Sequence, residues 1–483
     1  MDFETIIGLE LHAQVLTHSK MYCGCSASYS DAPPNTHVCP VCLGLPGVLP
    51  VINRAAVEKT VMTGIALNCS IPRYNKFDRK NYMYPDLMKG YQVSQYDLPI
   101  AVNGYVDVDV NGREVRVGIT RVHLEEDTAR LTHRSGVDGE RSLVDVNRSG
   151  VPLMEIVSEP DMHSPEEARE FLIAVRRILR YIGASSGNME EGAFRCDANV
   201  SQRSTDGSII GPKVEIKNMN SFRSVERALE YEVARQRAAL RNGETLVQET
   251  RGWLEDRAIT VGQRSKEYAH DYRYFPEPDL PPVLLDEGFL AAVESRMPEL
   301  PRVRQRRLRE QYGLSHADAA LLADEKAVAD YYEAAVTAAG GHAREIAHWV
   351  TGELFAIARN RSELGEVGIP PTSLAEIVSM VVAGEVNALT GKELLTTLAG
   401  SDVSPRAYVA QHGLAQVRDA DAVREVVLEV LAANPDAVAD YRSGKKAAIG
   451  YLIGQGMRRM KGAGNPDALR RTMTDILDND SSS

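Results

Sequence analysis

The stretch Ile7-Gly8-Leu9-Glu10-Leu11-His12-Ala13-Gln14-Val15 alternates apolar residues with polar or small ones. A period of two is that of a β-strand, because successive side chains of a strand point to opposite faces of the sheet. The pattern predicts a strand with one buried face and with Glu10 and His12 together on the other. That polar face is either a strand edge in solvent or the wall of a site, and periodicity alone leaves both open.

Further strand-like runs occupy residues 101–110 and 115–124, with Gly, Pro and Asn residues between such runs. Helical patterns interrupt them at residues 165–182 and 221–242. The first is opened by Ser164 as the cap and Pro165 at the first helical position. This part of the chain is therefore predicted to be α+β, with a large mixed or antiparallel sheet.

The chain has 483 residues, which is too long for one hydrophobic core, so two or three domains are expected. A proline-rich tract at residues 275–282 breaks both helix and strand and is expected to mark a boundary. From about residue 295, Ala, Leu, Arg and Glu recur at helical spacing. We predict a sheet-rich domain at residues 1–294 and two all-helical domains at residues 295–405 and 406–483.

Composition is that of an ordinary globular protein, with 43% hydrophobic and 25% charged residues. The N-terminus lacks a basic segment followed by an apolar one, and no window holds the roughly 18 apolar residues that a membrane span needs. A cytoplasmic protein without membrane contact is expected.

The net charge of −12 disfavours nucleic acid binding by the molecule as a whole, so such binding needs a local basic patch. Residues 442–471 are rich in Lys and Arg and contain one acid, Asp467. The candidate phosphate-binding residues there are Lys445, Lys446, Arg458, Arg459 and Lys461.

Four cysteines form two close pairs, and these are Cys23, Cys25, Cys39 and Cys42. Two pairs of thiolates suit tetrahedral zinc, and four thiolates would close the coordination sphere and leave the metal a structural role. Unpaired reduced cysteines and redox chemistry are the alternatives. The redox reading is disfavoured, because a redox motif starts a helix and the Leu-Gly-Leu-Pro-Gly sequence at residues 43–47 does not easily continue one.

Acidic and basic residues gather in four further segments. Residues 122–127 end in Glu125 and two more acids, a grouping that a divalent cation would neutralise but that is otherwise a solvated turn. Residues 76–86 interleave Arg79 and Lys80 with tyrosines, which suits phosphate binding or a surface hairpin. Residues 195–199 and 214–218 could complete an oxygen-rich metal site. No glycine-rich phosphate-binding loop of the common types is present.

Taken together, seven segments resemble the B-subunit family of bacterial-type glutamyl/aspartyl-tRNA amidotransferases, the GatB family. The segments are residues 7–12, 38–47, 77–82, 123–127, 147–153, 195–199 and 271–279. They follow one another in the family's order along the whole chain. The resemblance implies a cradle-shaped N-terminal domain that binds ATP, magnesium and the aminoacyl end of tRNA. A helical domain and a tRNA-binding tail domain similar to the small YqeY proteins would follow.

The resemblance also implies an activity and partners. Family members work in a heterotrimer with an amidase subunit, which releases ammonia from glutamine, and a small C subunit. The side-chain carboxylate of Glu-tRNA(Gln) or Asp-tRNA(Asn) is phosphorylated by ATP, and ammonia then displaces the phosphate. A similar archaeal-type family carries a large inserted domain, and no such insert is visible here. The alternative from another class is a tRNA-binding scaffold with structural zinc and no ATP chemistry.

Site residues are carried over by motif. The resemblance implies that Glu10 and Glu125 are magnesium ligands and that His12, Asp197 and Glu215 surround the metal and the nucleotide. Lys80 would contact phosphate or the substrate carboxylate, and Arg79 and Lys217 would help to bind the nucleotide.

Overall fold

The computed structural model describes residues 2–136, 139–263, 272–358, 364, 366–416, 420–460 and 464–479. Contacts between Cα atoms divide the chain into two compact units, Met1–Pro301 and Arg302–Ser483. Each unit is described by itself.

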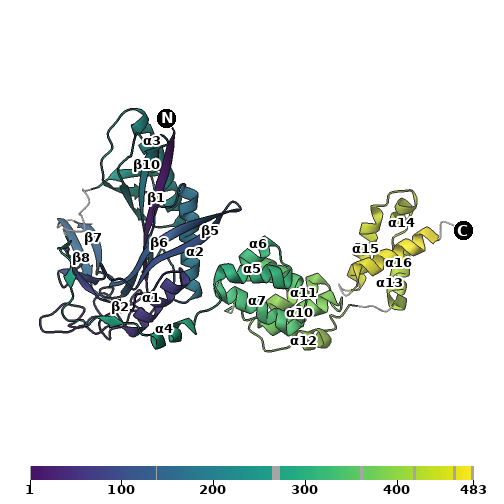
Figure 1. Ribbon diagram of the computed structural model, residues 1–483. Coiled ribbons are helices and arrows are strands. Elements are labelled where there is room, and N and C mark those ends of the chain that lie inside the picture. The colour runs from purple at the N-terminus through teal and green to yellow at the C-terminus, as the bar shows by residue number, and fades with distance from the viewer. Residues whose placement is uncertain are drawn as a thin grey trace. The chain divides into compact units, whose positions relative to one another are not determined.

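The first unit is built on an eight-stranded sheet with the order β13-β12-β11-β10-β1-β9-β6-β5 (Figure 1). The strands are β1 (Phe3–Gln14), β5 (Ala101–Val110), β6 (Arg113–Glu126), β9 (Pro152–Ser158), β10 (Phe194–Ser204), β11 (Val214–Met219), β12 (Thr250–Leu254) and β13 (Ile259–Gly262). The pair β11 and β12 is parallel, whereas the other neighbours in this sheet are antiparallel. The predicted mixed sheet of an α+β fold is thereby confirmed.

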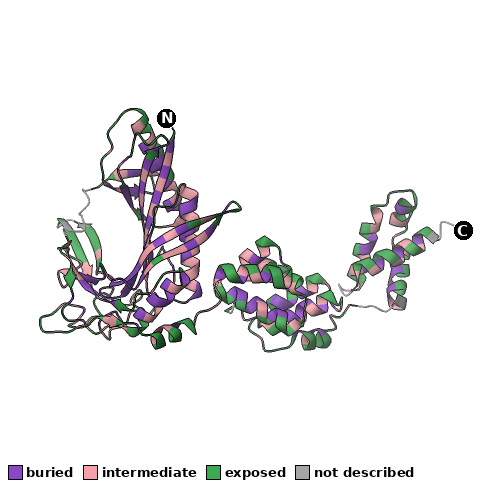
Figure 2. Ribbon diagram, in the orientation of Figure 1, coloured by how far each residue is buried: buried purple, intermediate pink, exposed green. Residues whose placement is uncertain are grey.

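Helices cover one face of this sheet (Figure 1). They are α1 (Arg54–Ala66), α2 (Pro165–Tyr181) and α3 (Phe222–Arg241). Ser164 and Ser221 cap α2 and α3 by accepting hydrogen bonds from backbone N–H groups in the first helical turn. Buried and partly buried residues alternate along the whole of β1 (Figure 2), as the period of two predicts. The apolar side chains of β1 enter the core beneath the helices, so its polar side chains lie on the opposite face.

Shorter strands complete the unit. They are β2 (Tyr74–Asn75), β3 (Asp78–Asn81), β4 (Tyr91–Ser94), β7 (Arg130–Gly136), β8 (Gly139–Asp145), β14 (Phe275–Pro276) and β15 (Val283–Leu284). Strands β14, β3 and β4 form one small sheet, β15 pairs with β2, and β7 and β8 form a hairpin.

The proline-rich tract lies inside the first compact unit. Phe275 on β14 pairs with Arg79 on β3, and Glu277 is buried where it accepts hydrogen bonds from Arg79. Proline is tolerated at the edge of a sheet, where its missing N–H leaves no gap in the ladder. The helix α4 (Glu287–Glu294) then places Val293 in the core of the first unit. The unit reaches Pro301, close to the expected boundary at residue 294, which stays a prediction.

The second unit is helical. Its elements are α5 (Pro301–Tyr312), α6 (His316–Leu322), α7 (Lys326–Ala339), α8 (Ala343–His348), the π-helix η2 (Trp349–Leu354), α9 (Phe355–Ile357), α10 (Pro371–Val382), α11 (Ala388–Thr397), α12 (Pro405–His412), α13 (Ala420–Ala433), α14 (Pro435–Arg442), α15 (Ala448–Arg459) and α16 (Pro466–Asn479). One hydrophobic cluster runs from Leu308 to Val409 and another from Val423 to Leu477. Since Val409 on α12 belongs to the first cluster, α12 packs with the helices that precede it. The division near residue 405 stays a prediction.

Among the described residues, every helix is too short or too polar to cross a membrane.

Candidate active site

A cavity of about 660 Å³ opens on the face of the large sheet that the helices leave uncovered. Seven residues predicted from the sequence line it: Glu10, His12, Lys80, Glu125, Asp197, Glu215 and Lys217. Arg79, which was also predicted to bind the nucleotide, is not among the lining residues. Residues from five strands far apart in the sequence thus converge in one polar cavity.

The pairing of β1 with β10 explains two of these positions. Glu10 lies directly across from Asp197, so two acids are neighbours on one face of the sheet. Like charges at such positions repel each other. The Lys217 ammonium lies 2.8 Å from the Asp197 carboxylate and offsets this repulsion. Burial and the Glu155 carboxylate nonetheless raise the pKa of Glu10.

Glu155 on β9 is the centre of the site, and the sequence analysis missed it. It lies across from His12 on β1 and from His123 on β6. Its Oε2 atom is 3.4 Å from the Nε2 atom of each histidine. The signal was available, because Glu155 is the one charged residue in the apolar run Pro152–Ser158, and a buried charge needs partners.

Five side chains form two groups of possible metal ligands that share Glu155. One group is Glu10, His12 and Glu155, and the other is His123, Glu125 and Glu155; within each, ligand atoms lie within 4.8 Å of one another. Glu10 and Glu125, predicted as ligands of one magnesium ion, therefore belong to neighbouring groups joined by Glu155. The carboxylates suit Mg²⁺, whereas the imidazoles also suit Mn²⁺, Fe²⁺ or Zn²⁺.

The electrostatics of this cluster are those of buried, mutually compensating charges. Burial lowers the pKa of His123, but the carboxylates of Glu155 and Glu125 outweigh it and raise that pKa to about 9. Burial raises the pKa of Glu155, but His123 and His12 outweigh it and hold that pKa well below its usual range. A metal ion in this site would replace the imidazolium protons as the counter-charge of the carboxylates.

Lys80 and Arg79 are neighbours on β3 and point in opposite directions, as a strand requires. Lys80 reaches the cavity, with its Nζ atom 4.9 Å from the ring centre of Tyr272. In the part of the chain that the structure describes, no carboxylate lies within ion-pair distance of Lys80. Burial disfavours its charge, but Glu125 and other nearby acids outweigh burial and raise its pKa.

Arg79 instead has a structural role. Its Nε and Nη2 atoms lie 2.7 Å from the two carboxylate oxygens of Glu277, and its guanidinium lies over the ring of Tyr91. This bidentate pair joins β3 to the segment that follows β14. The period of two that brings Lys80 into the cavity therefore takes Arg79 away from it.

Two further cations line the cavity and were missed. Arg195 lies across from His12 on β10, and its Nη2 atom is 3.1 Å from the buried carboxylate of Asp127. Arg121 on β6 lies 3.4 Å from Glu155. Arg195 was within a segment that the sequence analysis singled out, but its partner Asp127 is distant in sequence.

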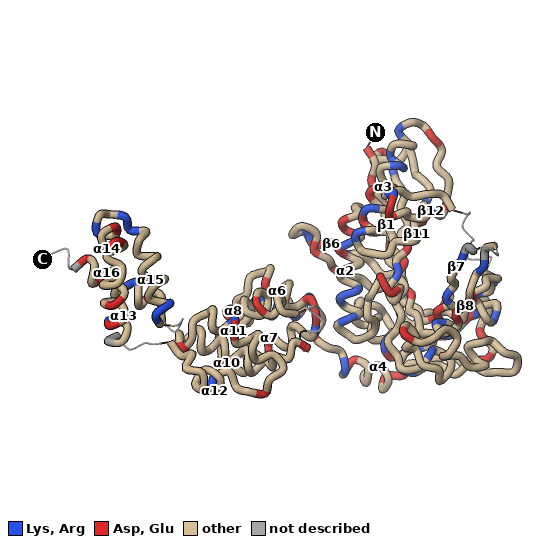
Figure 3. The backbone as a smooth tube through the Cα atoms, turned by 180° about the vertical axis from the view of Figure 1, so that it is seen from behind, with Lys and Arg blue, Asp and Glu red and all other residues tan. Residues whose placement is uncertain are grey.

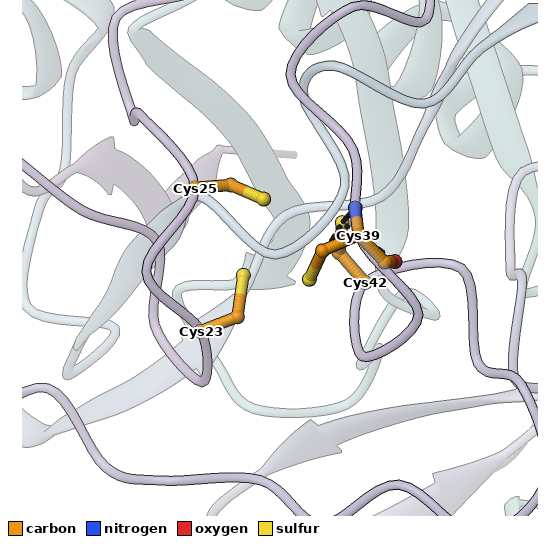
Figure 4. Close-up of side chains that lie close together, drawn as sticks. All are labelled: Cys23, Cys25, Cys39 and Cys42. Atoms are coloured by element: carbon orange, nitrogen blue, oxygen red, sulfur yellow. Dashed lines mark hydrogen bonds between the residues drawn. The ribbon is translucent and has the colours of Figure 1, made fainter.

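The four predicted zinc ligands lie together in the first unit. Figure 4 shows Cys23 and Cys25 facing Cys39 and Cys42, and the four sulfur atoms lie within 4.8 Å of one another. Tetrahedral Zn–S bonds of about 2.3 Å imply sulfur atoms roughly 3.8 Å apart. The Sγ atoms of Cys39 and Cys42 are 3.9 Å apart. A hydrogen bond between the thiols of Cys23 and Cys42 lowers the pKa of Cys42 and raises the pKa of Cys23.

The basic residues of the tail are exposed but mostly paired. Lys445 lies 2.8 Å from Asp440, Lys446 lies 3.3 Å from Asp478, and Arg459 lies 2.7 Å from Glu429. Figure 3 accordingly shows acids on the helices around the basic end of α15. Arg458 is exposed on α15, and Lys461 lies outside the described residues. Exposed ion pairs are weak, so these pairings contribute little to stability.

Two family models match successive parts of the chain. A family model described as the GatB/GatE catalytic domain matches residues 5–291, and one described as the GatB domain matches residues 330–477. The sheet unit, with its acid-rich cavity, is thus a catalytic domain of the GatB/GatE class. The chain as a whole belongs to the GatB family, and the resemblance seen in its sequence motifs is confirmed.

Three relatives, each named as the B subunit of an aspartyl/glutamyl-tRNA(Asn/Gln) amidotransferase, match the chain from end to end. The protein of Thermomicrobium roseum is 62% identical over 478 residues, 99% of each chain. That of Roseiflexus castenholzii is 50% identical over 483 residues, 99% of each chain. That of Moorella thermoacetica is 48% identical over 478 residues, which is 99% of this chain and all of the relative.

Proposed function

We propose that this chain is the subunit of a tRNA-dependent amidotransferase that activates the side-chain carboxylate of Glu or Asp attached to tRNA. ATP would phosphorylate that carboxylate, and ammonia released from glutamine by an amidase subunit would then form the amide. A small third subunit would complete the heterotrimer, and the cytoplasm is the expected location. The names of the relatives support the substrates and the subunit role.

The observation that carries the proposal is the cavity in which acids and the partly buried Lys80 meet. Glu10, Glu125 and Glu155 surround two histidines, and Lys80 lines the same cavity from another sheet. A carboxylate is a poor electrophile because its charge repels nucleophiles and its oxygen leaves badly. Phosphoryl transfer mainly requires positioning and positive charge near the phosphate oxygens.

The residues on each side of the cavity would then have separate roles. The carboxylates of Glu10, Glu125 and Glu155 would hold magnesium, which when bound neutralises charge on the phosphates of ATP. Lys80 would contact the transferred phosphate or the substrate carboxylate. Lys217 would contact the nucleotide, with Asp197 and Glu215 beside it. Arg195 would add a cation that Asp127 holds in place.

Two further assignments belong to the proposal. The four cysteines would hold a structural zinc ion, because their four sulfur atoms converge. Lys445, Lys446, Arg458, Arg459 and Lys461 would bind phosphates of the tRNA.

A scaffold that binds tRNA without ATP chemistry is the alternative. It would need no convergence of Glu10, Glu125 and Lys80, and the cavity that these three residues share favours the enzyme. Buried charges without a ligand are costly to keep, which is a second reason to prefer a binding site.

The test is ATP-dependent phosphate release by the complex reconstituted with its amidase and third subunit. Glu-tRNA(Gln) and Asp-tRNA(Asn) are supplied in turn, with Gln-tRNA(Gln) as the substrate that needs no activation. We expect release and amide formation with at least one misacylated tRNA. Glu125→Gln should abolish both and leave glutamine hydrolysis by the partner partly intact. Full amidation by the Glu125→Gln complex would support the scaffold instead.

A further inference from the structure

Four tyrosines form a continuous aromatic chain along one wall of the cavity. Tyr82 contacts Tyr272 edge to face, Tyr272 contacts Tyr274 in the same way, and Tyr274 stacks on Tyr96. The last pair is nearly parallel, with ring centres 4.4 Å apart and planes 9° apart. All four residues line the cavity, whose remaining wall is dominated by charged side chains.

The two ends of this chain differ. At the inner end, the Lys80 ammonium lies 4.9 Å from the ring centre of Tyr272 and 5.7 Å from that of Tyr82. At the outer end, Tyr96 is 52% exposed although Tyr274 covers one face of its ring. Packed tyrosine rings therefore connect the Lys80 ammonium, which can bind a phosphate, to the exposed ring of Tyr96.

The position of Tyr96 is held by its backbone. It follows β4, and its N–H donates a 3.0 Å hydrogen bond to the buried carboxylate of Asp78 on β3. Tyr274 directly precedes β14, which pairs with the same strand β3. Because β3 also carries Lys80, the small sheet fixes the cation and the stacked pair relative to each other. Such preorganisation favours binding, because these side chains are already ordered before the ligand binds.

We propose that Tyr96, backed by Tyr274, is a stacking platform for an adenine ring whose phosphates lie toward Lys80. Planar bases stack on aromatic side chains, and a ring already stacked on one side offers its second face. The proposal rests on the proposed function, which brings two adenines to the cavity. One is the base of ATP, and the other is the terminal adenosine of the aminoacyl-tRNA.

The test compares Tyr96→Ala, Tyr96→Leu and Tyr96→Phe in the reconstituted complex. The Michaelis constant for ATP is measured at saturating Glu-tRNA, and that for Glu-tRNA at saturating ATP. We expect Tyr96→Ala and Tyr96→Leu to raise one of the two constants roughly 10-fold, and Tyr96→Phe to keep it within about twofold. The constant that rises identifies the source of the adenine. Tyr74→Ala is the matched control, because Tyr74 is 48% exposed on β2 and lies outside the cavity lining.

Equilibrium dialysis of ATP and gel-shift titration of Glu-tRNA repeat the comparison without turnover. If neither affinity nor either Michaelis constant changes more than twofold in Tyr96→Ala, the platform is refuted, whatever the complex catalyses. If the wild-type complex binds adenine through Tyr96 but amidates no tRNA, the platform stands and the proposed function fails. Equal losses in Tyr96→Leu and Tyr96→Phe would also refute stacking, since only Phe keeps an aromatic face.

Discussion

Glu155 connects the two groups of acids and imidazoles in the cavity. One of its carboxylate oxygens faces both His12 and His123, and the other lies 3.4 Å from Arg121. The negative charge of this buried carboxylate compensates the positive charges of its three cationic neighbours. Its removal would leave those neighbours uncompensated and would take a shared ligand from both metal-binding groups.

We therefore predict that Glu155→Gln lowers amidation about 100-fold or more and weakens binding of the divalent cation. The readouts are the rate of amide formation and a titration with Mn²⁺ as the spectroscopic probe. Glu159→Gln is the matched control, because Glu159 is exposed just beyond β9 and outside the cavity lining. If Glu155→Gln amidates at a rate within threefold of the wild type, Glu155 is not part of the catalytic site.

The neighbours Lys80 and Arg79 allow a second comparison at this scale. Lys80→Met should lower the turnover rate about 100-fold, since a positioned charge near a transferred phosphate has an effect of that size. Arg79→Met should instead lower the unfolding midpoint, because it leaves the buried Glu277 without its bidentate partner. Steady-state kinetics and thermal unfolding of both variants give the result. A larger kinetic loss in Arg79→Met would restore its predicted role at the nucleotide.

Among the elements, the two cysteine-bearing loops are held by contacts at several points. The Lys20 ammonium is buried and donates hydrogen bonds to the carbonyls of His37 and Val146. The N–H of Cys39 donates a 3.1 Å hydrogen bond to the Cys42 sulfur, and the N–H of Lys20 donates to the carbonyl of Cys25. The loops are thus arranged around the sulfur atoms, and Asn53, the N-cap of α1, also donates hydrogen bonds to the carbonyls of Ser19 and Lys20.

We predict that the purified protein carries one zinc ion and that Cys39→Ser loses it. Loss of the metal should lower the unfolding midpoint, because the bound ion stabilises only the folded loops. Elemental analysis and thermal unfolding are the measurements. Cys69→Ser is the control, since Cys69 lies outside the group of four and should keep the metal. A wild-type protein without zinc, and with the same midpoint as Cys39→Ser, would contradict the metal site.

Over the whole molecule, the distribution of charge and of hydrophobic clusters suggests a division of labour. The acid-rich cavity lies in the first unit, whereas the basic residues near α15 lie on helices of the second unit that share a hydrophobic cluster of their own. On α15, Leu452 and Ile453 are buried, whereas Arg458 and Arg459 are exposed at the surface. In the proposed function, the tail would bind phosphates of the tRNA without taking part in the chemistry.

Removal of residues 420–483 should therefore weaken tRNA binding and spare the cavity. The truncation keeps α12, whose Val409 packs with the preceding helices. We expect the Michaelis constant for misacylated tRNA to rise at least 10-fold, with a weaker dependence on salt because phosphate contacts are lost. The ATP affinity of the complex should stay within twofold. The double variant Arg458→Gln/Arg459→Gln should raise the same Michaelis constant by a smaller factor. If this constant is unchanged in both the truncated protein and the double variant, the tail does not bind tRNA.

Local sequence patterns were enough to predict much of this architecture. Alternation in residues 7–15 predicted the face of β1 that carries Glu10 and His12, and helical spacing predicted that the chain beyond about residue 295 is helical. Spacing likewise grouped the four cysteines. These features depend on neighbours within one strand, helix or loop, where side-chain direction follows from backbone geometry.

Long-range pairing accounts for the rest. Glu155 becomes central because β9 lies between β1 and β6, and Arg79 turns away from the cavity because it pairs with Glu277, far along the chain. The proline-rich tract joins the first unit through β14, against its local propensity. The sequence of a strand predicts which residues share a face. Which residues lie next to that face depends on tertiary packing, because burial and charge compensation are properties of the folded chain.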